Sequence, residues 1–442
     1  MKARFIPAVV LSSALVGVLL APSTPAFAGP YDGYTLRVKL IGGAQYEPLY
    51  TIIPEWEKKT GAKVDIISRK NYFDLDKEYK QDIAARKIDY CVGSNHTSFA
   101  PQYPGLFRDL KGLVPADYIG KFSPRVIEQA TVGGKLVQLP RHSDISELYY
   151  NKKFYDDAGN KSAYKAKFGK DLAPPTTWDE ADQQAKFFAK PPSVYGTQFA
   201  GKDEAITGRF YEMLRANGGQ LFDKNWKPTF NSPAGVKSLN WFVDLYKSGA
   251  VPKGSPNYVW DDLGNGFASG TVAFDLDWSG WAAFFNDPKS SKIAGEVGIA
   301  PAPKGSAGIR TGWSGSHSFS ITQTCDNPKA AADFIEFLTS YDAQMLEARR
   351  GLIPTRLDAQ QAALAEFKAK NDTYMADIFT TFSKAMRDES FTPPLIPEWI
   401  QASNLIWPQL QKAIVGDKTS QQALDDAAKQ VEAMMDDAGY YK

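Results

Sequence analysis

The chain has 442 residues, of which 43% are hydrophobic and 23% are charged, and its formal net charge is +1. This length suits two domains better than one. Positive and negative side chains are mixed along the chain, so there is no basic field to hold nucleic acid or an anionic membrane.

The first 28 residues have the features of an export signal. Lys2 and Arg4 precede an apolar stretch at residues 6–20, and the Ala-Phe-Ala sequence at residues 26–28 fits a signal-peptidase site. About fifteen apolar residues are too few for a membrane-spanning helix, which needs about twenty. No cysteine follows Ala28, so we predict a periplasmic protein without a lipid anchor. Its net charge becomes −1 once Lys2 and Arg4 are lost.

The mature part begins with alternating strand and helix patterns. Strands are expected at residues 36–40, 64–66 and 90–92, and helices with one apolar face at residues 49–56 and 75–83. This strand–helix–strand order implies a parallel sheet whose faces are covered by helices.

The same mixture of elements continues to the C-terminus. Gly133 and Gly134 predict a hairpin turn, and Thr177 with Glu180 predicts a capping box. Further helices are expected near residues 233–248, 328–339 and 421–436, and further strands near residues 148–150, 271–276, 297–301 and 318–322. The predicted fold class is therefore α/β.

The chain has two cysteines, Cys91 and Cys325. An oxidising compartment permits a disulfide between them, but the sequence does not show whether their Cα atoms lie within bridging distance. Both a disulfide and two separate buried thiols are compatible with the sequence.

The sequence offers little support for an enzyme. Its three histidines, His96, His142 and His317, have no metal-site spacing, and no CxxC motif occurs. Ser314 lies in an incomplete nucleophile elbow, and His317 three residues later need not face it. A glycosidase needs only two well-spaced carboxylates and stays as the alternative. We predict no catalytic residue, no metal and no cofactor.

Several tryptophans lie in polar, loop-like surroundings, where an indole ring can stack on a sugar while small polar groups bind its hydroxyls. These are Trp278, Trp281, Trp313 and Trp399. Three others fall within helix patterns and are expected in the core, where most large aromatic side chains lie: Trp56, Trp178 and Trp241.

Five short motifs follow one another along the mature chain. They are LYYNK at residues 148–152, PPTTWDE at 174–180, FASGTVA at 267–273, NPKAA at 327–331 and RGLIPTR at 350–356. Each motif is weak alone. Their order and spacing together are similar to extracellular solute-binding protein family 1 of ABC importers, the carbohydrate-type group that includes maltose-binding protein.

The resemblance implies a two-lobed periplasmic-binding-protein fold, in which each lobe is a mainly parallel sheet flanked by helices. The chain is then expected to cross between the lobes near residues 142–147, 308–313 and 340–350. Lobe 1 corresponds to residues 29–143 plus 310–343, and lobe 2 to residues 144–309 plus 344–442.

The resemblance also implies which side chains face the cleft between the lobes. The candidate ligand-binding residues are Gln45, Tyr46, Asn95, His96, Arg141, His142, Asp144, Trp278, Trp281, Gly312, Trp313, Arg350 and Trp399. As a charged pair, His142 and Asp144 suit hydroxyl groups, because ionised partners make the stronger hydrogen bonds. Arg356 is either a further cleft residue or a structural ion-pair partner. His96 and Thr97 stand where oligosaccharide binders commonly have charged residues.

We therefore predict the periplasmic solute-binding component of an ABC importer. As a monomer it closes by a hinge on a sugar or oligosaccharide and presents it to a membrane-embedded permease. The alternatives are a binder of a polyol, a sugar phosphate or another small polar solute on the same fold, and a secreted glycosidase. The sequence names neither the solute nor the permease.

Overall fold

The computed structural model describes residues 1, 29–43 and 45–442. The predicted export signal therefore lies outside the described residues, as does Ala44 of the first predicted cleft loop. Among the described residues, no helix has both the length and the apolar character needed to cross a membrane.

The first lobe is built on three parallel strands and the helices between them. Strand β1 (Thr35–Ile41) pairs with β2 (Lys63–Lys70) on one side and with β3 (Val92–His96) on the other. Helices α2 (Ile53–Thr60) and α3 (Tyr72–Ala85) connect these strands in turn, as the sequence predicts. The third strand begins two residues later than expected, because Tyr90 and Cys91 lie before the paired segment.

Two long strands run between the lobes, and the other strands that pair with them are mostly antiparallel to them. Strand β6 (Leu139–Asn151) is antiparallel to β9 (Gly312–Ile321), and its second half is antiparallel to β7 (Phe274–Trp278) and β8 (Val297–Ala300). The expectation of two mainly parallel sheets is therefore wrong outside the β1–β3 unit and the short β9–β11 contact. Strands β6 and β9 connect the lobes in opposite directions, so they pair antiparallel.

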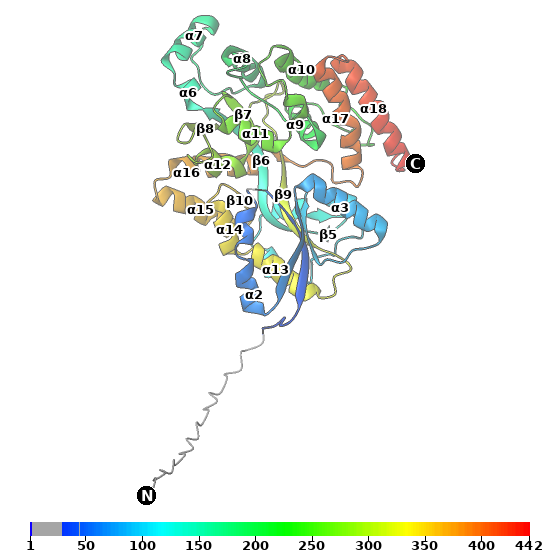
Figure 1. Cartoon of the computed structure of the whole chain (residues 1–442). Coiled ribbons are helices and arrows are strands. Elements are labelled where there is room, and N and C mark those ends of the chain that lie inside the picture. Colours follow the sequence, from blue (N-terminus) through cyan, green and yellow to red (C-terminus); the bar gives the residue numbers. More distant parts are fainter. Residues whose placement is uncertain (2–28, 44) are drawn as a thin grey trace.

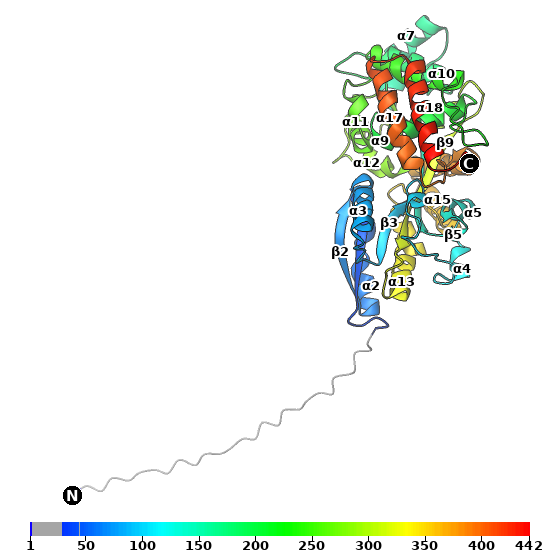
Figure 2. The same cartoon turned by 90° about the vertical axis from the view of Figure 1, so that its right-hand side faces the viewer.

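Figure 1 shows two lobes with β6 and β9 at their junction, and Figure 2 shows them stacked along the long axis of the molecule. Helix α13 (Pro328–Leu338) covers the first lobe together with α2 and α3. The second lobe carries α9 (Asp203–Ala216), α10 (Pro233–Lys247), α17 (Trp399–Val415) and α18 (Ser420–Asp437).

The other helices and strands complete the two lobes. The helices are α1 (Glu47–Tyr50), α4 (Ala116–Ile119), α5 (Pro124–Gln129), α6 (Lys152–Tyr155), α7 (Ala158–Phe168), α8 (Trp178–Phe188), α11 (Trp260–Ala268), α12 (Ala282–Phe285), α14 (Tyr341–Ala348), α15 (Leu357–Ala369) and α16 (Thr373–Asp388). The strands are β4 (Thr131–Val132), β5 (Lys135–Leu136), β10 (Ile353–Pro354) and β11 (Ser390–Phe391).

Local sequence signals account for many of these boundaries. The side chains of Thr177, Ser232 and Asn327 each accept a backbone hydrogen bond at the start of α8, α10 and α13. Strands β4 and β5 form the predicted hairpin around Gly133 and Gly134, which both have positive φ. The helix starts and the hairpin are therefore confirmed, because each depends on residues only a few positions apart. The capping box is only half formed, because the Glu180 carboxylate accepts from the Thr176 backbone and hydroxyl and not from the Thr177 backbone.

The two cysteines form a disulfide between Cys91 and Cys325. It joins the segment before β3 to the segment after β9, the two strands that pair in the first lobe. Strand pairing therefore settles the choice that the sequence left open.

Candidate functional site

All three histidines of the chain lie side by side across three neighbouring strands. His96 on β3 is directly opposite His317 on β9, and His317 is directly opposite His142 on β6. The ring centroids of these neighbours are 4.9 and 5.0 Å apart. We call these three residues the histidine row, and strand register assembles them from distant parts of the sequence.

Asp144 projects over the histidine row from the neighbouring position on the same face of β6. Its Oδ2 atom lies 3.3 Å from His317 Nε2 and 4.0 Å from His96 Nε2, and its Oδ1 atom lies 3.6 Å from His142 Nε2. Opposite Asp144 stands Gly315, where an added Cβ would come within 2.8 Å of His96 Nε2. The absence of a side chain at Gly315 thus makes room for the His96 ring.

A backbone hydrogen bond sets the protonation of His96. The Ser98 N–H donates to His96 Nδ1 over 3.1 Å, so Nδ1 is an acceptor and the neutral ring carries its hydrogen on Nε2. Burial lowers the pKa of His96 to about 4. The Nε2–H group on the Asp144 side is therefore a hydrogen-bond donor.

Burial disfavours charge in the histidine row and on Asp144, whereas the sequence predicts an ionised His142–Asp144 pair. Burial, together with Arg141 and His96, holds the pKa of His142 well below its usual value. Burial also raises the pKa of Asp144 well above its usual value. Both shifts favour neutral side chains because this part of the molecule is shielded from water.

His96, Asp144 and His317 place their potential ligand atoms within 4.8 Å of one another, which is close enough to hold a metal ion. A metal-bound histidine needs a free lone pair on the ligating nitrogen and normally donates from the other nitrogen. In His96 the roles of the two ring nitrogens are reversed, because Nδ1 accepts a hydrogen bond from the Ser98 N–H and Nε2 carries the hydrogen. The hydrogen bond therefore opposes metal binding through His96.

Arg141 lies behind the site and holds its elements together. Its guanidinium group contacts Glu347 at 2.5 Å and donates to the Tyr46 carbonyl at 3.0 Å and the Tyr50 hydroxyl at 3.1 Å. Glu347 belongs to α14, so Arg141 joins a predicted crossover to the first cleft loop. Its role as a direct ligand contact stays a prediction.

The side chains of Gln45 and Tyr46 form a short chain of hydrogen bonds that leads to the histidine row. Tyr46 OH lies 3.1 Å from His317 Nε2, and the Gln45 amide donates to Tyr46 OH over 3.0 Å. The Tyr46 ring also stacks on His142, with centroids 5.9 Å apart. A Cβ on Gly280 in the second lobe would come within 2.3 Å of Gln45 Oε1. The loop after β1 therefore packs closely against the segment after β7.

Three tryptophans face one another on the second-lobe side of the site. Trp278 at the end of β7 is perpendicular to Trp260 and to Trp313, with centroids 5.1 and 6.4 Å apart. Trp313 packs against α9 at Gly208, where an added Cβ would overlap its ring. Register places Trp278 on the face of β6 that carries Asp144.

A buried polar group adjoins these rings. Arg209 on α9 contacts Glu212 and Ser146 Oγ, each at 2.5 Å, and donates to the Leu276 carbonyl at 3.0 Å. Its guanidinium group also lies 5.7 Å from the Trp260 ring centroid. The positive charge of Arg209 is therefore already balanced by Glu212.

The other predicted site residues lie at the edges of this arrangement. Trp281 stacks on Phe285 in the second-lobe core, and Trp399 is fully buried with its Nε1 donating to Glu204. Asn95 donates to Ser320 Oγ and accepts from the Tyr72 hydroxyl and the His96 amide. Gly312 packs on Ile145, whereas Arg350 is exposed. Whether these residues bind solute stays a prediction.

Two further predictions depend on which way a side chain faces. Ser314 and His317 occupy opposite faces of β9, and Ser314 Oγ donates to the Phe391 carbonyl, so they do not form a nucleophile–base pair. Arg356 pairs with Asp358 at 2.7 Å, which supports its structural role.

The predicted site residues do not include His317, Arg209 or Trp260. His317 had a detectable signal, because Trp313, Gly315 and His317 alternate along one strand and so share a face. Arg209 and Trp260 had none, because each lies on a helix whose orientation depends on the tertiary fold.

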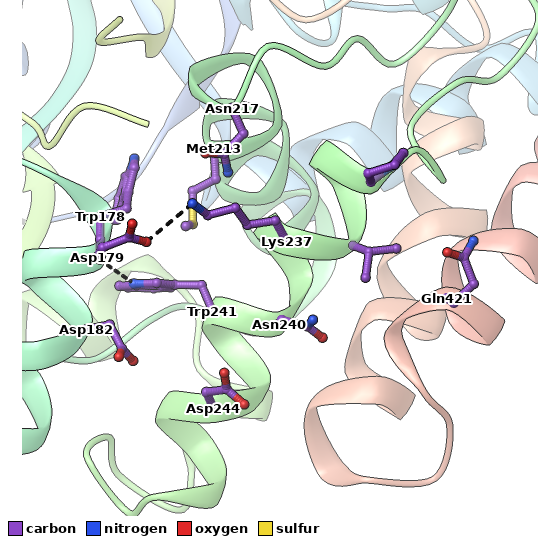
Figure 3. Close-up of a pocket in the computed structure, with 12 residues that line it drawn as sticks. Trp178, Asp179, Asp182, Met213, Asn217, Lys237, Asn240, Trp241, Asp244 and Gln421 are labelled. Atoms are coloured by element: carbon purple, nitrogen blue, oxygen red, sulfur yellow. Dashed lines mark hydrogen bonds and ion pairs between the residues drawn. The ribbon is translucent and has the colours of Figure 1, made fainter. Parts of the chain in front are cut away.

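A groove of about 650 Å³ opens elsewhere in the second lobe, between α8, α10 and the start of α18 (Figure 3). Trp178 and Trp241 lie at its wall, and Lys237 reaches towards Asp179 across it. Both tryptophans are buried, as the sequence predicts for core residues. The residues that line this groove include none of the predicted ligand-binding residues.

Comparison with known proteins agrees with this architecture. The family described as bacterial extracellular solute-binding protein matches residues 42–345. A curated relative from Sinorhizobium fredii, named a probable amino-acid ABC transporter periplasmic-binding protein, is 26% identical over 98% of this chain and 96% of its own length.

Two solved structures are similar over almost the whole chain. The maltose-bound protein MalE3 of T. maritima is 27% identical, with a TM-score of 0.78 over 91% of this chain and 100% of its own. A solute-binding protein from Agrobacterium vitis with bound D-mannitol is 25% identical, with a TM-score of 0.79 over 92% of this chain and 100% of its own.

Proposed function

Since this chain belongs to the bacterial extracellular solute-binding protein family, we propose that it captures an uncharged sugar or polyol between its lobes. It is the solute-binding component of an ABC importer, and its partners are a small-molecule solute and a membrane permease. The solute class and the residues that contact it are the proposed part.

One observation carries the proposal: polar groups converge beside aromatic rings at the junction of the lobes. Within the described part of the chain, Asp144 Oδ2 and both ring nitrogens of His142 are buried without a hydrogen-bond partner. Buried polar atoms are normally satisfied, so such a group favours a bound molecule with hydroxyls. Trp278 and Trp313 supply ring faces for its C–H surface.

The lobe boundaries are part of the same proposal. Lobe 1 comprises residues 29–143 and 310–343, and lobe 2 comprises residues 144–309 and 344–442. Strand β6 passes from β9 pairing to β7 pairing between Ile145 and Ser146, which supports the position of the first crossover.

We also propose periplasmic location after cleavage behind Ala28, without a lipid anchor, and binding without turnover as a monomer. Mass measurement of the exported protein tests the cleavage site. Prolonged incubation with maltose, followed by chromatography of the sugar, tests turnover, and release of glucose favours a glycosidase instead.

A thermal-shift screen tests the proposed solute class directly. A bound solute raises the melting temperature by mass action. We expect stabilisation by at least one uncharged solute among maltose, D-mannitol, ribitol and D-glucose. Stabilisation by amino acids alone contradicts the proposal. It favours amino-acid binding, as the name of the Sinorhizobium fredii relative describes for that protein.

A further inference from the structure

The two strands that connect the lobes separate from each other at a single level of the structure. Strand β6 pairs with β9 as far as Ile145, which lies opposite Ser314, and from Ser146 onwards it pairs with β7. Strand β9 changes its partner at the same level, because Trp313 pairs with Phe391 of β11. Continued pairing would have placed Trp313 opposite Ser146. We call the point where these two residues part the strand fork.

A single carboxylate group from α9 lies in the strand fork. Glu212 Oε1 accepts one hydrogen bond from the Ser146 hydroxyl over 3.0 Å and another from the Trp313 N–H over 3.2 Å. The backbone carbonyl of Glu212 accepts from the Thr311 hydroxyl over 2.7 Å. Glu212 is only 1% exposed, so bulk water does not compete for these hydrogen bonds. Glu212 therefore ties β6 and the start of β9 to α9 at one place.

Arg209, one turn earlier on α9, completes this arrangement. Its guanidinium group donates to Glu212 Oε2 and to Ser146 Oγ, each at 2.5 Å, and to the Leu276 carbonyl of β7 at 3.0 Å. Both charged groups are buried, so each needs the other as its partner. We call Glu212, Arg209 and Ser146 the fork clamp.

The fork clamp adjoins all three tryptophans at the junction of the lobes, which we call the tryptophan group: Trp260, Trp278 and Trp313. The Trp313 amide is bound directly, and the Trp260 ring lies beside Arg209. Trp278 lies opposite Ser146 in the pairing of β6 with β7, and its ring is perpendicular to the other two. The relative orientation of the three rings therefore depends on where the fork clamp holds these strands.

We propose that Glu212 is a positioning residue for solute binding, because it ties both connecting strands to α9 and thereby holds the tryptophan group as one surface of the second lobe. This inference rests on the proposed function, and it requires no contact between Glu212 and the solute. The close packing of Trp313 on Gly208 supports it, because the ring lies directly against the helix that carries Glu212. The competing role for Glu212 is only to balance the charge of Arg209.

Two double variants separate these roles, because they differ only in the acceptor at position 212. Both carry Arg209→Met, so neither leaves a buried positive charge without its partner. In the first, Glu212→Gln retains a side-chain oxygen that accepts from Ser146 and Trp313. In the second, Glu212→Leu supplies a side chain of similar size without an acceptor. Charge balance alone predicts that the two proteins behave alike, whereas the positioning role predicts that they differ.

Hydrogen exchange and calorimetry measure the difference. We expect the Trp313 amide of the solute-free protein to exchange at least about 10-fold faster with Glu212→Leu than with Glu212→Gln, because its acceptor is gone. Calorimetry uses maltose, D-mannitol, ribitol and D-glucose. We expect about 10-fold weaker affinity with Glu212→Leu, comparable to the contribution of one stacking ring.

Two single variants serve as controls for this comparison. Asp333 on α13 of the first lobe also holds a buried tryptophan, since it accepts from Trp56 Nε1 over 2.6 Å. We expect Asp333→Asn to lower the melting temperature without changing Trp313 exchange or solute affinity. Ser146→Ala is milder than the double variants, because it removes one hydroxyl from the fork clamp and retains the ion pair. We expect it to weaken affinity by about 3-fold.

Circular dichroism and solute-free melting curves establish which variants are folded. Equal Trp313 exchange and equal affinity in the two folded double variants overturn the inference, and Glu212 then only balances Arg209. If the protein with Glu212→Leu does not fold, Ser146→Ala decides, and unchanged affinity in that variant overturns the inference.

The exchange measurement also distinguishes this inference from the proposed function. If none of the four solutes binds the wild type, the proposed function is contradicted. Faster Trp313 exchange with Glu212→Leu still supports the tie at the strand fork in that case, whereas equal exchange overturns it.

Discussion

Two tryptophan pairs with almost the same geometry lie in very different surroundings. Trp178 and Trp241 are perpendicular with centroids 5.0 Å apart, and Trp260 and Trp278 are perpendicular with centroids 5.1 Å apart. The first pair is buried among helices, where Trp241 Nε1 donates to the Trp178 carbonyl. The second lies beside the Arg209 guanidinium and the Trp313 ring.

The comparison shows that ring geometry alone does not distinguish a core pair from a binding surface. Perpendicular packing is favourable in both places because the positive edge of one ring meets the negative face of the other. Charged groups lie beside both pairs, but Arg209 and Glu212 beside the second pair are buried at the junction of the lobes, whereas Lys237 and Asp179 beside the first pair are exposed.

Replacing the buried ring is the change with the largest expected effect. We expect Trp241→Ala to lower the free energy of unfolding by about 3–5 kcal/mol, because it leaves a cavity among packed helices. Denaturant titration measures this loss. Solute affinity of the folded fraction should not change, and a loss of affinity with normal stability would place Trp241 in a binding site instead.

A pH series separates the two regions, because all three histidines lie in the site. As pH falls from 6.5, the unfolded chain protonates His96, whereas the folded chain does so only near its pKa of about 4. The contribution of His96 to stability is therefore complete above pH 6.5 and lost as pH falls towards 4. The His96 contribution changes the free energy of unfolding by at most about 1.4 kcal/mol per pH unit.

The matched variant for this measurement is His96→Gln, which does not titrate. Buried Asp144 has a raised pKa and acts in the opposite direction, since its contribution is lost as pH rises. The difference between wild type and variant therefore isolates His96. Parallel stability curves for the two proteins between pH 4 and 6.5 contradict the buried, neutral ring.

Replacing the ring at the lobe junction should affect binding more than folding. We expect Trp278→Ala to weaken solute affinity by about 1–2 kcal/mol, the loss of one stacking ring, with a smaller change in stability than Trp241→Ala. Calorimetry measures the affinity. Unchanged affinity in a folded Trp278→Ala variant contradicts a role of this ring in solute binding.

The smallest expected effect is a shift in tryptophan fluorescence when solute binds. The chain is expected to cross between the lobes at three places, so we expect a hinge motion on solute binding. In a protein that retains only Trp278, solute should shift the emission maximum by a few nanometres, whereas one that retains only Trp241 should show no shift. Solution scattering should show a smaller radius of gyration with solute, and superimposable curves contradict the hinge.

Some site residues could be predicted because they lie close together in the sequence or at the end of a predicted strand. His142 and Asp144 are two positions apart on one strand, and Trp278 ends the strand that it was expected to follow. Gln45 and Tyr46 lie together in the loop after β1 and β3 ends at His96, as the family resemblance implied. In each case the resemblance or a local pattern was sufficient.

Other features depended on information that no local pattern carries. The lowered pKa of His142 follows from its burial beside Arg141 and His96, and the donor on His96 follows from the Ser98 amide. The antiparallel pairing of β6 follows from the path of the chain between the lobes. The exposed Ile83 on α3 also departs from its helical stripe, because no element packs over that turn within the described residues.

The sequence by itself determined the α/β class, the main helices, the capped helix starts and the family, because these depend on periodicity, turn chemistry and motif order. Only the tertiary structure decided that His96, His142 and His317 share one site, that Cys91 meets Cys325, and that Asp144 faces a donor. Such encounters depend on strand register between segments as far as 234 residues apart. Register is set by the packing of whole lobes, so no short stretch of sequence contains it.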